Sequence, residues 1–325
     1  MPDVVPETRT TAPRANAVSA DRIPVVDITA LRDDSDPVGV ARALHAASRD
    51  LGFIYVSGHG IPRDVIEQAR AAAYGFFRSD AANRVRVAVS QHHRGWIATG
   101  GAVMADGVKP DLKESFVWGI EPAADDGHPL RGSNQWPDSP AAFRAASLAY
   151  FAAADRVARH LMRGFALGLS LPDDFFLRQC AQPLSRASYV YYPPQADGDH
   201  RQFGVGPHTD FGVLTVLCQD DVGGLEVQDT GGRWLKAPPI EGTLVVNVAD
   251  LLSRWTDGYY TSTPHRVVNR SGRERLSLVL AWDPDPDTPI DSRAVFGEAH
   301  TPSQPPITCG DYLVWRFGQA FAHRT

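Results

Sequence analysis

The spacing of hydrophobic residues along the first half of the chain predicts helices and short strands. Apolar side chains recur every three or four residues over 37–51, 63–77 and 141–169, as expected for helices with one buried face. Runs of β-branched and aromatic residues at 23–29 and 53–57 predict two strands. The chain therefore opens as strand, helix, strand and helix, and one longer helix follows.

After residue 183 the hydrophobic pattern becomes that of short strands. Five β-branched or aromatic runs are separated by turn residues, and a sixth lies near the C-terminus. These runs are 188–192, 214–217, 225–228, 244–248, 276–282 and 312–317. Many short strands with frequent turns are typical of a barrel or sandwich. We therefore predict a mainly β protein with flanking helices and an N-terminal α/β portion.

The same pattern divides the chain into three segments. Residues 1–20 are rich in Pro, Thr and Ala, and we expect a poorly ordered tail there. Residues 21–180 form a helical and mixed region, in which 90–140 is rich in Gly, Pro and Trp and predicts an irregular lobe. Residues 181–325 hold the β core with a C-terminal extension. We expect the last two segments to form one integrated unit.

Composition and charge exclude several classes of protein. The 325 residues carry a net charge of −6, which gives no indication of a basic surface for nucleic acid. No run approaches about 18 apolar residues, and the N-terminus lacks the apolar stretch of a secretory signal, so we expect no membrane span. The three cysteines lie far apart in no CxxC pattern, which argues against a disulfide scaffold and favours the cytoplasm.

His208 and Asp210 form the first pair that suggests a chemical role. At the end of a strand, side chains two residues apart point the same way, so this imidazole and carboxylate would converge. Alone, the pair also suits two solvated turn residues after Pro207. His265, at the start of a later β-type run, completes a set of two histidines and one carboxylate. That set suits a non-haem Fe(II) site with open positions, although zinc hydrolases also use three such ligands.

Arg275 and Ser277 form a second pair on one face of a predicted strand, shortly after His265. An arginine that points into a barrel needs an anionic partner, because an unpaired buried charge is costly. A dicarboxylate that also chelates the metal would supply that partner through the guanidinium fork and the hydroxyl. Alternatively, Arg275 faces solvent or pairs with Glu274.

With these residues in this order, the chain resembles the iron(II)/2-oxoglutarate-dependent oxygenases of the isopenicillin N synthase-like family. The resemblance covers about 23–317 and is most specific over 208–285, which contains H-x-D, the distal histidine and R-x-S in the family's order. The stretches LGFIYVSGHGI and DLKESF are similar to family hallmarks as well. The resemblance implies a double-stranded β-helix, or jelly roll, flanked by helices.

The resemblance also implies the bound groups. Fe(II) would lie on His208, Asp210 and His265, and the distal carboxylate of 2-oxoglutarate on Arg275 and Ser277. O2 is implied as the second co-substrate, and ascorbate as a reductant.

Tyr192 matches a further family position. Many members carry Asn-Tyr-Tyr-Pro before the first metal ligand, and its second tyrosine helps to hold the co-substrate. Here the segment reads Val-Tyr-Tyr-Pro, so Val190 replaces the asparagine. The alternative is that Tyr192 is only an aromatic residue of the barrel wall.

These residues favour one class of reaction. Related iron halogenases lack the carboxylate that Asp210 supplies, and the R-x-S pair argues against an isopenicillin-type oxidase that needs no oxo-acid. The resemblance therefore implies hydroxylation, desaturation or cyclisation of a small molecule of natural-product type, with release of succinate and CO2. The alternatives are an ethylene- and succinate-forming activity, an isopenicillin-type oxidase, a zinc hydrolase and an inactive binding protein.

The substrate pocket is expected over the iron. Its aromatic candidates are Phe116, Phe211 and Trp282, each of which could equally belong to the core. The sequence selects neither a particular substrate nor an oligomeric state.

Overall fold

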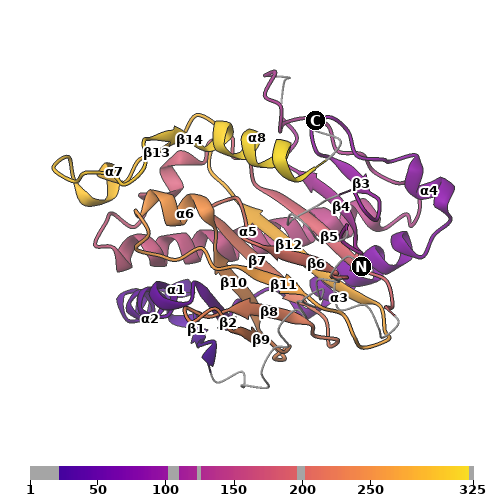
Figure 1. The fold of residues 1–325 in the computed structure, drawn as a ribbon, viewed down its shortest axis with the longest axis horizontal. Coiled ribbons are helices and arrows are strands. Elements are labelled where there is room, and N and C mark those ends of the chain that lie inside the picture. Colours follow the sequence, from indigo (N-terminus) through magenta and orange to yellow (C-terminus); the bar gives the residue numbers. More distant parts are fainter. Residues whose placement is uncertain (1–21, 102–109, 123–125, 196–201, 322–325) are drawn as a thin grey trace, which may run out of the picture.

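The strands form two main sheets, and helices cover the outer face of the larger one (Figure 1). The computed structural model describes residues 22–101, 110–122, 126–195 and 202–321. The predicted tail at 1–20 lies outside these described residues, and the division at residue 180 stays a prediction. Strands from both sides of that division share the larger sheet, so the described parts of the two segments are built into one another.

The larger sheet has eight strands, which are antiparallel except for the pair β1 and β2. In spatial order they are β1 (Val25–Asp27), β2 (Phe53–Ser57), β10 (Leu244–Val248), β7 (Leu214–Gln219), β12 (Arg275–Trp282), β5 (Arg186–Tyr192), β4 (Glu114–Gly119) and β3 (Gly95–Ile97). The smaller sheet has the order β6 (Val205–His208), β11 (His265–Val267), β8 (Leu225–Gln228) and β9 (Trp234–Lys236). A two-stranded sheet joins β13 (Pro289–Ile290) to β14 (Ile307–Thr308).

Three amphipathic helices form the layer outside the larger sheet. The longest, α5 (Phe143–Gly168), contacts α2 (Pro37–Asp50), α3 (Arg63–Phe77) and the sheet strands β7 and β12. These helices and the strands β1, β2, β7, β8, β10 and β12 lie close to the ranges that the hydrophobic pattern predicts. The remaining helices are α1 (Thr29–Arg32), α4 (Ala81–Val85), the 3-10 turn Leu177–Gln179, α6 (Asp250–Trp255), α7 (Arg293–Phe296) and α8 (Cys309–Ala320).

Strand alternation separates two layers of the interior. On β12, Leu278, Leu280 and Trp282 are fully buried in the core beneath the helices. The intervening residues Val279 and Ala281 face the other sheet instead and line a cavity. Because successive side chains of a strand point to opposite faces, the larger sheet carries the core on one side and a cavity wall on the other.

Residues 90–140 are more regular than their composition suggests. They contribute β3 and β4, which extend the larger sheet beyond β5, so the prediction of an irregular lobe is wrong for these two strands. The other described residues of 90–140 belong to no helix or strand. Glycine at the start of β3 and at the end of β4 lowers the strand signal of the sequence. Pairing with β5 supplies the hydrogen bonds that fix both strands as sheet.

The predicted C-terminal strand at 312–317 is wrong as well. The segment is part of α8, whose first turn is capped by the Thr308 hydroxyl, which accepts a hydrogen bond from the Asp311 N–H. Leu313 and Phe317 are four residues apart and both buried, so they form one helical face. Aromatic and β-branched composition favours a strand here, but the helical spacing of the buried pair decides the structure.

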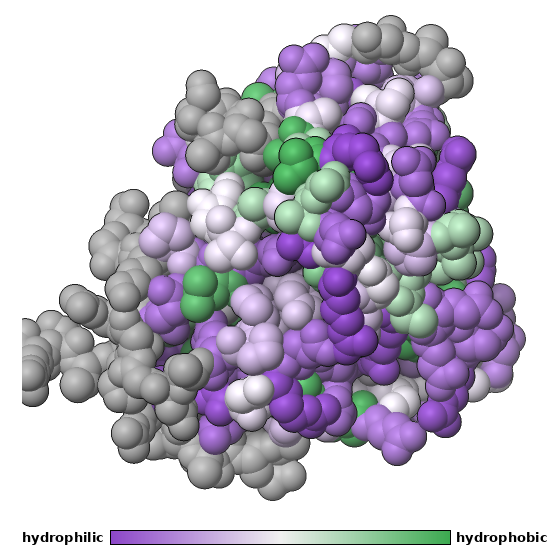
Figure 2. Space-filling model, turned by 90° about the vertical axis from the view of Figure 1, so that its right-hand side faces the viewer, coloured by the Kyte–Doolittle hydropathy of each residue, from purple (hydrophilic) through white to green (hydrophobic). Residues whose placement is uncertain are grey.

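The outer surface agrees with a protein that keeps its apolar residues inside. Figure 2 shows a face that is mostly hydrophilic, with apolar residues in small separate groups. Among the described helices, none combines the length and the apolarity that crossing a membrane requires.

Candidate active site

His208, Asp210 and His265 meet at one point of the smaller sheet. His208 ends β6 and His265 begins β11, and the two residues pair directly across the strands. Asp210 follows two residues after His208. Each histidine places its Nε2 atom 3.7 Å from the Asp210 Oδ1 atom, and the two imidazole rings lie 4.2 Å apart. One ligand atom from each residue lies within 4.8 Å of the others, so the group could hold a metal ion.

Backbone carbonyls orient both imidazoles. The His208 Nδ1–H donates to the Gly206 carbonyl at 2.8 Å, and the His265 Nδ1–H donates to the Thr263 carbonyl at 3.3 Å. A neutral imidazole that donates through Nδ1 keeps the lone pair on Nε2. Both lone pairs are therefore available on the side where Asp210 lies, which is the arrangement a divalent metal needs.

The charges of the three groups suit a cation. Burial and the neighbouring His265 lower the pKa of His208 well below its ordinary value, so its ring is neutral at pH 7. Burial opposes a charge on Asp210, but the two imidazoles and hydrogen bonds from Thr215 and Asn247 outweigh it and lower the pKa of the carboxyl. Two imidazole nitrogens and one carboxylate are a ligand set of non-haem iron.

Arg275 is fully buried and partly satisfied. Its Nε–H donates to the Gly223 carbonyl at 2.6 Å, and its Nη1–H donates to the Ser277 hydroxyl at 2.7 Å. The guanidinium carbon lies 4.7 Å from the centre of the Tyr192 ring. The Nη2 atom is buried without a hydrogen-bond partner in the described part of the chain. Since an unpaired buried donor is costly, this atom fits the carboxylate of a bound acid. Glu274, the alternative partner, bonds Arg78 and Tyr191 instead.

A partly open cavity of 180 Å³ lies beside the triad and is lined by both sheets. Tyr192 and Phe211 border it, together with all three residues of the triad. Arg275 and Ser277 do not border it directly, because the Tyr192 ring covers the guanidinium from that side.

Phe116 and Trp282 do not line the cavity, so the structure contradicts their predicted contact with substrate. Both are fully buried among the helices. On β4, the cavity side belongs to Ser115 and Val117, the immediate neighbours of Phe116. On β12, Trp282 is an odd number of residues from Ser277 and therefore points to the opposite face.

Replacing Phe116 by alanine tests this placement. The Phe116 ring packs against Phe76 and Phe143 with ring centres 5.1 and 4.7 Å away. We expect Phe116→Ala to lower the free energy of unfolding by about 3–5 kcal/mol, because it opens a cavity in the core. Chemical denaturation measures this loss. The matched control is Phe296→Ala, whose side chain is 40% exposed and whose loss should cost less; equal losses would contradict the assignment.

Sequence reasoning missed several polar residues of the cavity, among them one amide and two cationic side chains. Asn247, Lys113 and Arg186 all border it. Asn247 donates to the Asp210 Oδ2 atom at 2.8 Å, and the Lys113 ammonium lies 3.6 Å from Asp111. The sequence feature that these three residues share is a polar side chain within or next to an apolar strand. Only the pairing of distant strands shows which of these residues reach the cavity.

Comparison with known proteins places this geometry in a family. Residues 181–284 match the 2OG-Fe(II) oxygenase superfamily, and residues 23–139 match the N-terminal region of non-haem dioxygenases of morphine synthesis. A probable iron/ascorbate oxidoreductase of Dictyostelium discoideum is 34% identical over 305 residues, which are 82% of this chain and 83% of that protein. The chain belongs to the 2-oxoglutarate–iron(II) oxygenase superfamily.

Two further relatives show the same membership. A homoarginine-6-hydroxylase of Oryza sativa subsp. japonica is 34% identical, over 83% of this chain and 88% of that protein. The crystal structure of a full-length Neurospora crassa protein in complex with α-ketoglutarate and thymine superimposes with a TM-score of 0.82 at 28% identity, covering 94% of this chain and 99% of that one. These findings confirm the jelly-roll prediction and identify the oxygenase as a non-haem iron, 2-oxoglutarate-dependent dioxygenase that oxidises a small molecule. They do not favour the hydrolase, oxidase or inactive-protein alternatives.

Proposed function

We propose that His208, Asp210 and His265 bind the Fe(II) of this oxygenase, and that Arg275, Ser277 and Tyr192 hold the distal carboxylate of 2-oxoglutarate. The observation that carries the second assignment is the buried Arg275 Nη2 atom without a partner among the described residues. Ser277 accepts a hydrogen bond from Arg275, so its own hydroxyl proton is free to point at the same carboxylate. A cation and two hydroxyls are suitable donors for an anionic acid.

The protein's own residues bind, orient and shield. The bound metal and co-substrate supply the oxidising chemistry, which consumes O2 and releases succinate and CO2. Asn247 holds one oxygen of Asp210, which leaves the other facing the two histidines. Apolar side chains such as Val279 and Phe211 line the cavity and exclude water from it. No protein group is assigned the role of general base.

For the substrate, we propose a small molecule of natural-product type that enters the cavity beside the triad. The mainly apolar lining of the cavity, with a few polar groups beside the triad, supports this proposal. Two of the relatives act on or bind small molecules by their names or complexes, namely homoarginine and thymine. We also propose a cytoplasmic location, which is supported by the three free cysteines.

Two measurements test the proposed function. Adding 2-oxoglutarate to the anaerobic Fe(II) protein should produce a metal-to-ligand charge-transfer band, and candidate substrates should then stimulate succinate release. A protein that binds zinc in preference and gives no such band would contradict the proposal. Ethylene in the headspace without any added substrate would instead support the ethylene-forming alternative.

Asn247 offers a separate test of the metal assignment. Asn247→Ala removes the donor that fixes Asp210, and we expect Fe(II) affinity to fall by roughly ten- to a hundredfold, as is usual for partners of metal ligands. Competition with a chromogenic Fe(II) chelator measures the change. Asn269→Ala is the control, because Asn269 is equally buried but bonds only the turn at 269–273. Unchanged affinity in Asn247→Ala would remove its positioning role.

A further inference from the structure

Arg186 borders the cavity and lies in the same row of the larger sheet as Asn247, which bonds Asp210. In the larger sheet, Arg186 pairs with Ala281, and Ala281 pairs with Thr215. Thr215 in turn pairs with Asn247, the residue that holds Asp210. These four residues form one row across the sheet, in which Arg186 lies two strand spacings, about 10 Å, from Thr215.

The same register separates Arg186 from the proposed co-substrate site. Tyr192 pairs with Arg275, and Arg186 lies six residues earlier on the same strand. Six residues of a strand span about 20 Å. Arg186 is therefore too far along the sheet to share the carboxylate assigned to Arg275, and its partner must be a different group.

One edge of the Arg186 guanidinium is free for a ligand. Its Nη1–H donates to the Asp283 Oδ2 atom at 2.8 Å, and its carbon atom lies 4.5 Å from the centre of the Phe317 ring. Within the described residues, the Nε and Nη2 groups of Arg186 have no hydrogen-bond partner. The Arg186 side chain also borders the cavity. The Nε–Nη2 edge of an arginine presents two parallel N–H groups, which match the two oxygens of a carboxylate.

The local charge balance favours an anion at this edge. Asp283 is fully buried, and its second oxygen accepts the Val213 N–H at 3.0 Å. A second buried guanidinium, that of Arg94, donates to the carbonyls of His93 and Leu130 and to no carboxylate among the described residues. Burial and the nearby Arg186 lower the pKa of Arg94, with Glu121 acting in the opposite direction. Asp283 is thus the one carboxylate bonded to either guanidinium among the described residues.

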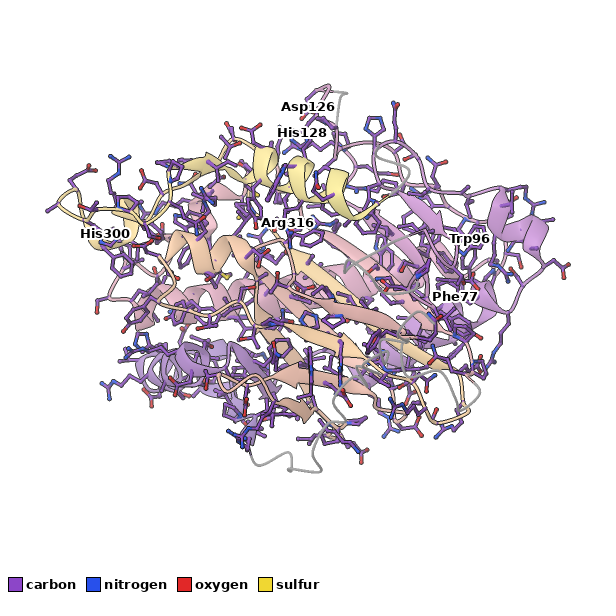
Figure 3. The ribbon with its side chains drawn as sticks, in the orientation of Figure 1. Phe77, Trp96, Asp126, His128, His300 and Arg316 are labelled. Atoms are coloured by element: carbon purple, nitrogen blue, oxygen red, sulfur yellow. The ribbon has the colours of Figure 1, made fainter. Side chains whose placement is uncertain are left out.

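One aromatic ring lies against the Arg186 guanidinium, and two more rings pack against that ring. Phe317 stacks on Phe321 with ring centres 5.3 Å apart and meets Phe211 edge-on at 5.8 Å, and all three rings border the cavity. Phe317 belongs to α8, which lies along one edge of the molecule in Figure 1. Arg316 is labelled beside this helix in Figure 3. It anchors the helix, because its guanidinium carbon lies 4.2 Å from the centre of the Phe211 ring and its Nη2 atom bonds Asp250 at 3.2 Å.

We infer that Arg186 determines substrate specificity: its Nε–Nη2 edge binds a carboxylate of the small molecule that the enzyme oxidises. The apolar body of that molecule packs against Phe211 and Phe317. The substrate class is then a small monocarboxylic acid with an apolar or aromatic body. This inference rests on the proposed function, because it places the substrate beside the metal that the triad would hold.

Matched pairs of acids and amides test the inference. The probes are phenylacetate, cinnamate and hexanoate, each compared with its amide. Isothermal titration into the anaerobic wild-type protein, loaded with Fe(II) and saturating 2-oxoglutarate, measures binding when the Arg275 site is already filled. At least one acid should bind roughly ten- to a hundredfold more tightly than its amide, because an ionised partner strengthens the hydrogen bonds.

Two variants of Arg186 and one control variant test whether Arg186 causes the preference for an acid over its amide. Arg186→Met should bring the acid and the amide to within about twofold of each other. Arg186→Met leaves Asp283 buried without its cation, so Arg186→Lys provides a second test. The lysine keeps the positive charge but lacks the paired Nε–H and Nη2–H donors. This variant should lose most of the preference for the acid over its amide. Arg178→Met is the control, because Arg178 pairs with Asp174 on the surface and lies outside the cavity.

The outcomes separate the inference from the proposed function. Equal binding of acids and amides in all three pairs, or no binding of any acid, overturns the inference. A preference that survives in Arg186→Lys and Arg186→Met overturns it as well. The charge-transfer titration with 2-oxoglutarate in the wild-type protein reports the proposed function independently, since it needs no third ligand.

Discussion

Replacing His208, Asp210 or His265 by alanine should abolish Fe(II)-dependent turnover and reduce succinate release to the level of metal-free protein. Each residue contributes one of only three proposed protein ligands, and the three ligand atoms lie within 4.8 Å of one another. The loss of one leaves a pair of donors that cannot enclose the same face of the metal. Succinate release under saturating Fe(II) and 2-oxoglutarate measures the effect.

The fold should survive these three substitutions. The triad residues are polar side chains at strand ends, and the apolar core does not depend on them. Circular dichroism and a thermal melt provide that check. His160→Ala on α5 is the control for removing an imidazole outside the cavity. Full activity in any triad variant would exclude that residue as a ligand. In Asp210→Gly, which opens a coordination position, weak halide binding is expected together with loss of hydroxylation.

Arg275→Lys should weaken 2-oxoglutarate binding by roughly ten- to a hundredfold, although it keeps the positive charge. In the native protein, the Gly223 carbonyl and the Ser277 hydroxyl hold the guanidinium so that Nη2 stays unpaired among the described residues. A lysine ammonium is a single point donor and cannot make the same three directed contacts. Titration of the anaerobic Fe(II) protein through the charge-transfer band measures the affinity.

Fe(II) affinity should remain nearly unchanged in Arg275→Lys, because Arg275 contacts none of the three proposed ligands. Arg273→Lys is the matched control two residues away, where the arginine is exposed and pairs with Asp221. Wild-type affinity for 2-oxoglutarate in both Arg275→Lys and Arg275→Ala would remove Arg275 from the co-substrate site and would contradict that part of the proposed function.

Short-range sequence patterns predict much of the fold and the centre of the site. The helical spacing over 63–77 and the β-branched run at 53–57 match α3 and β2, because burial on one face determines both patterns. His208 with Asp210, and Arg275 with Ser277, are recognisable because residues two apart at a strand share a face.

Long-range strand pairing explains what the sequence does not show. The positions of Arg186 and Asn247 in one row follow from the pairing of β5, β12, β7 and β10, which are far apart in the chain. The prediction that Phe116 and Trp282 contact substrate relies on their nearness in sequence to informative residues, which says nothing about the face of the sheet. Strand alternation counted from Ser277 already places Trp282 on the other face, so that residue can be excluded from the sequence alone.

The two-sided construction of β12 links loss of activity to loss of the fold. Its odd-numbered positions carry Arg275 and Ser277, and its even-numbered positions carry Leu276 and Leu278 of the core. A slip of this strand by one residue would move the guanidinium into the helix layer and a leucine into the cavity. Such a chain would lose its core packing together with the proposed co-substrate site. Chaperones and proteases that recognise exposed apolar surface would therefore also remove inactive molecules in which β12 is paired out of register.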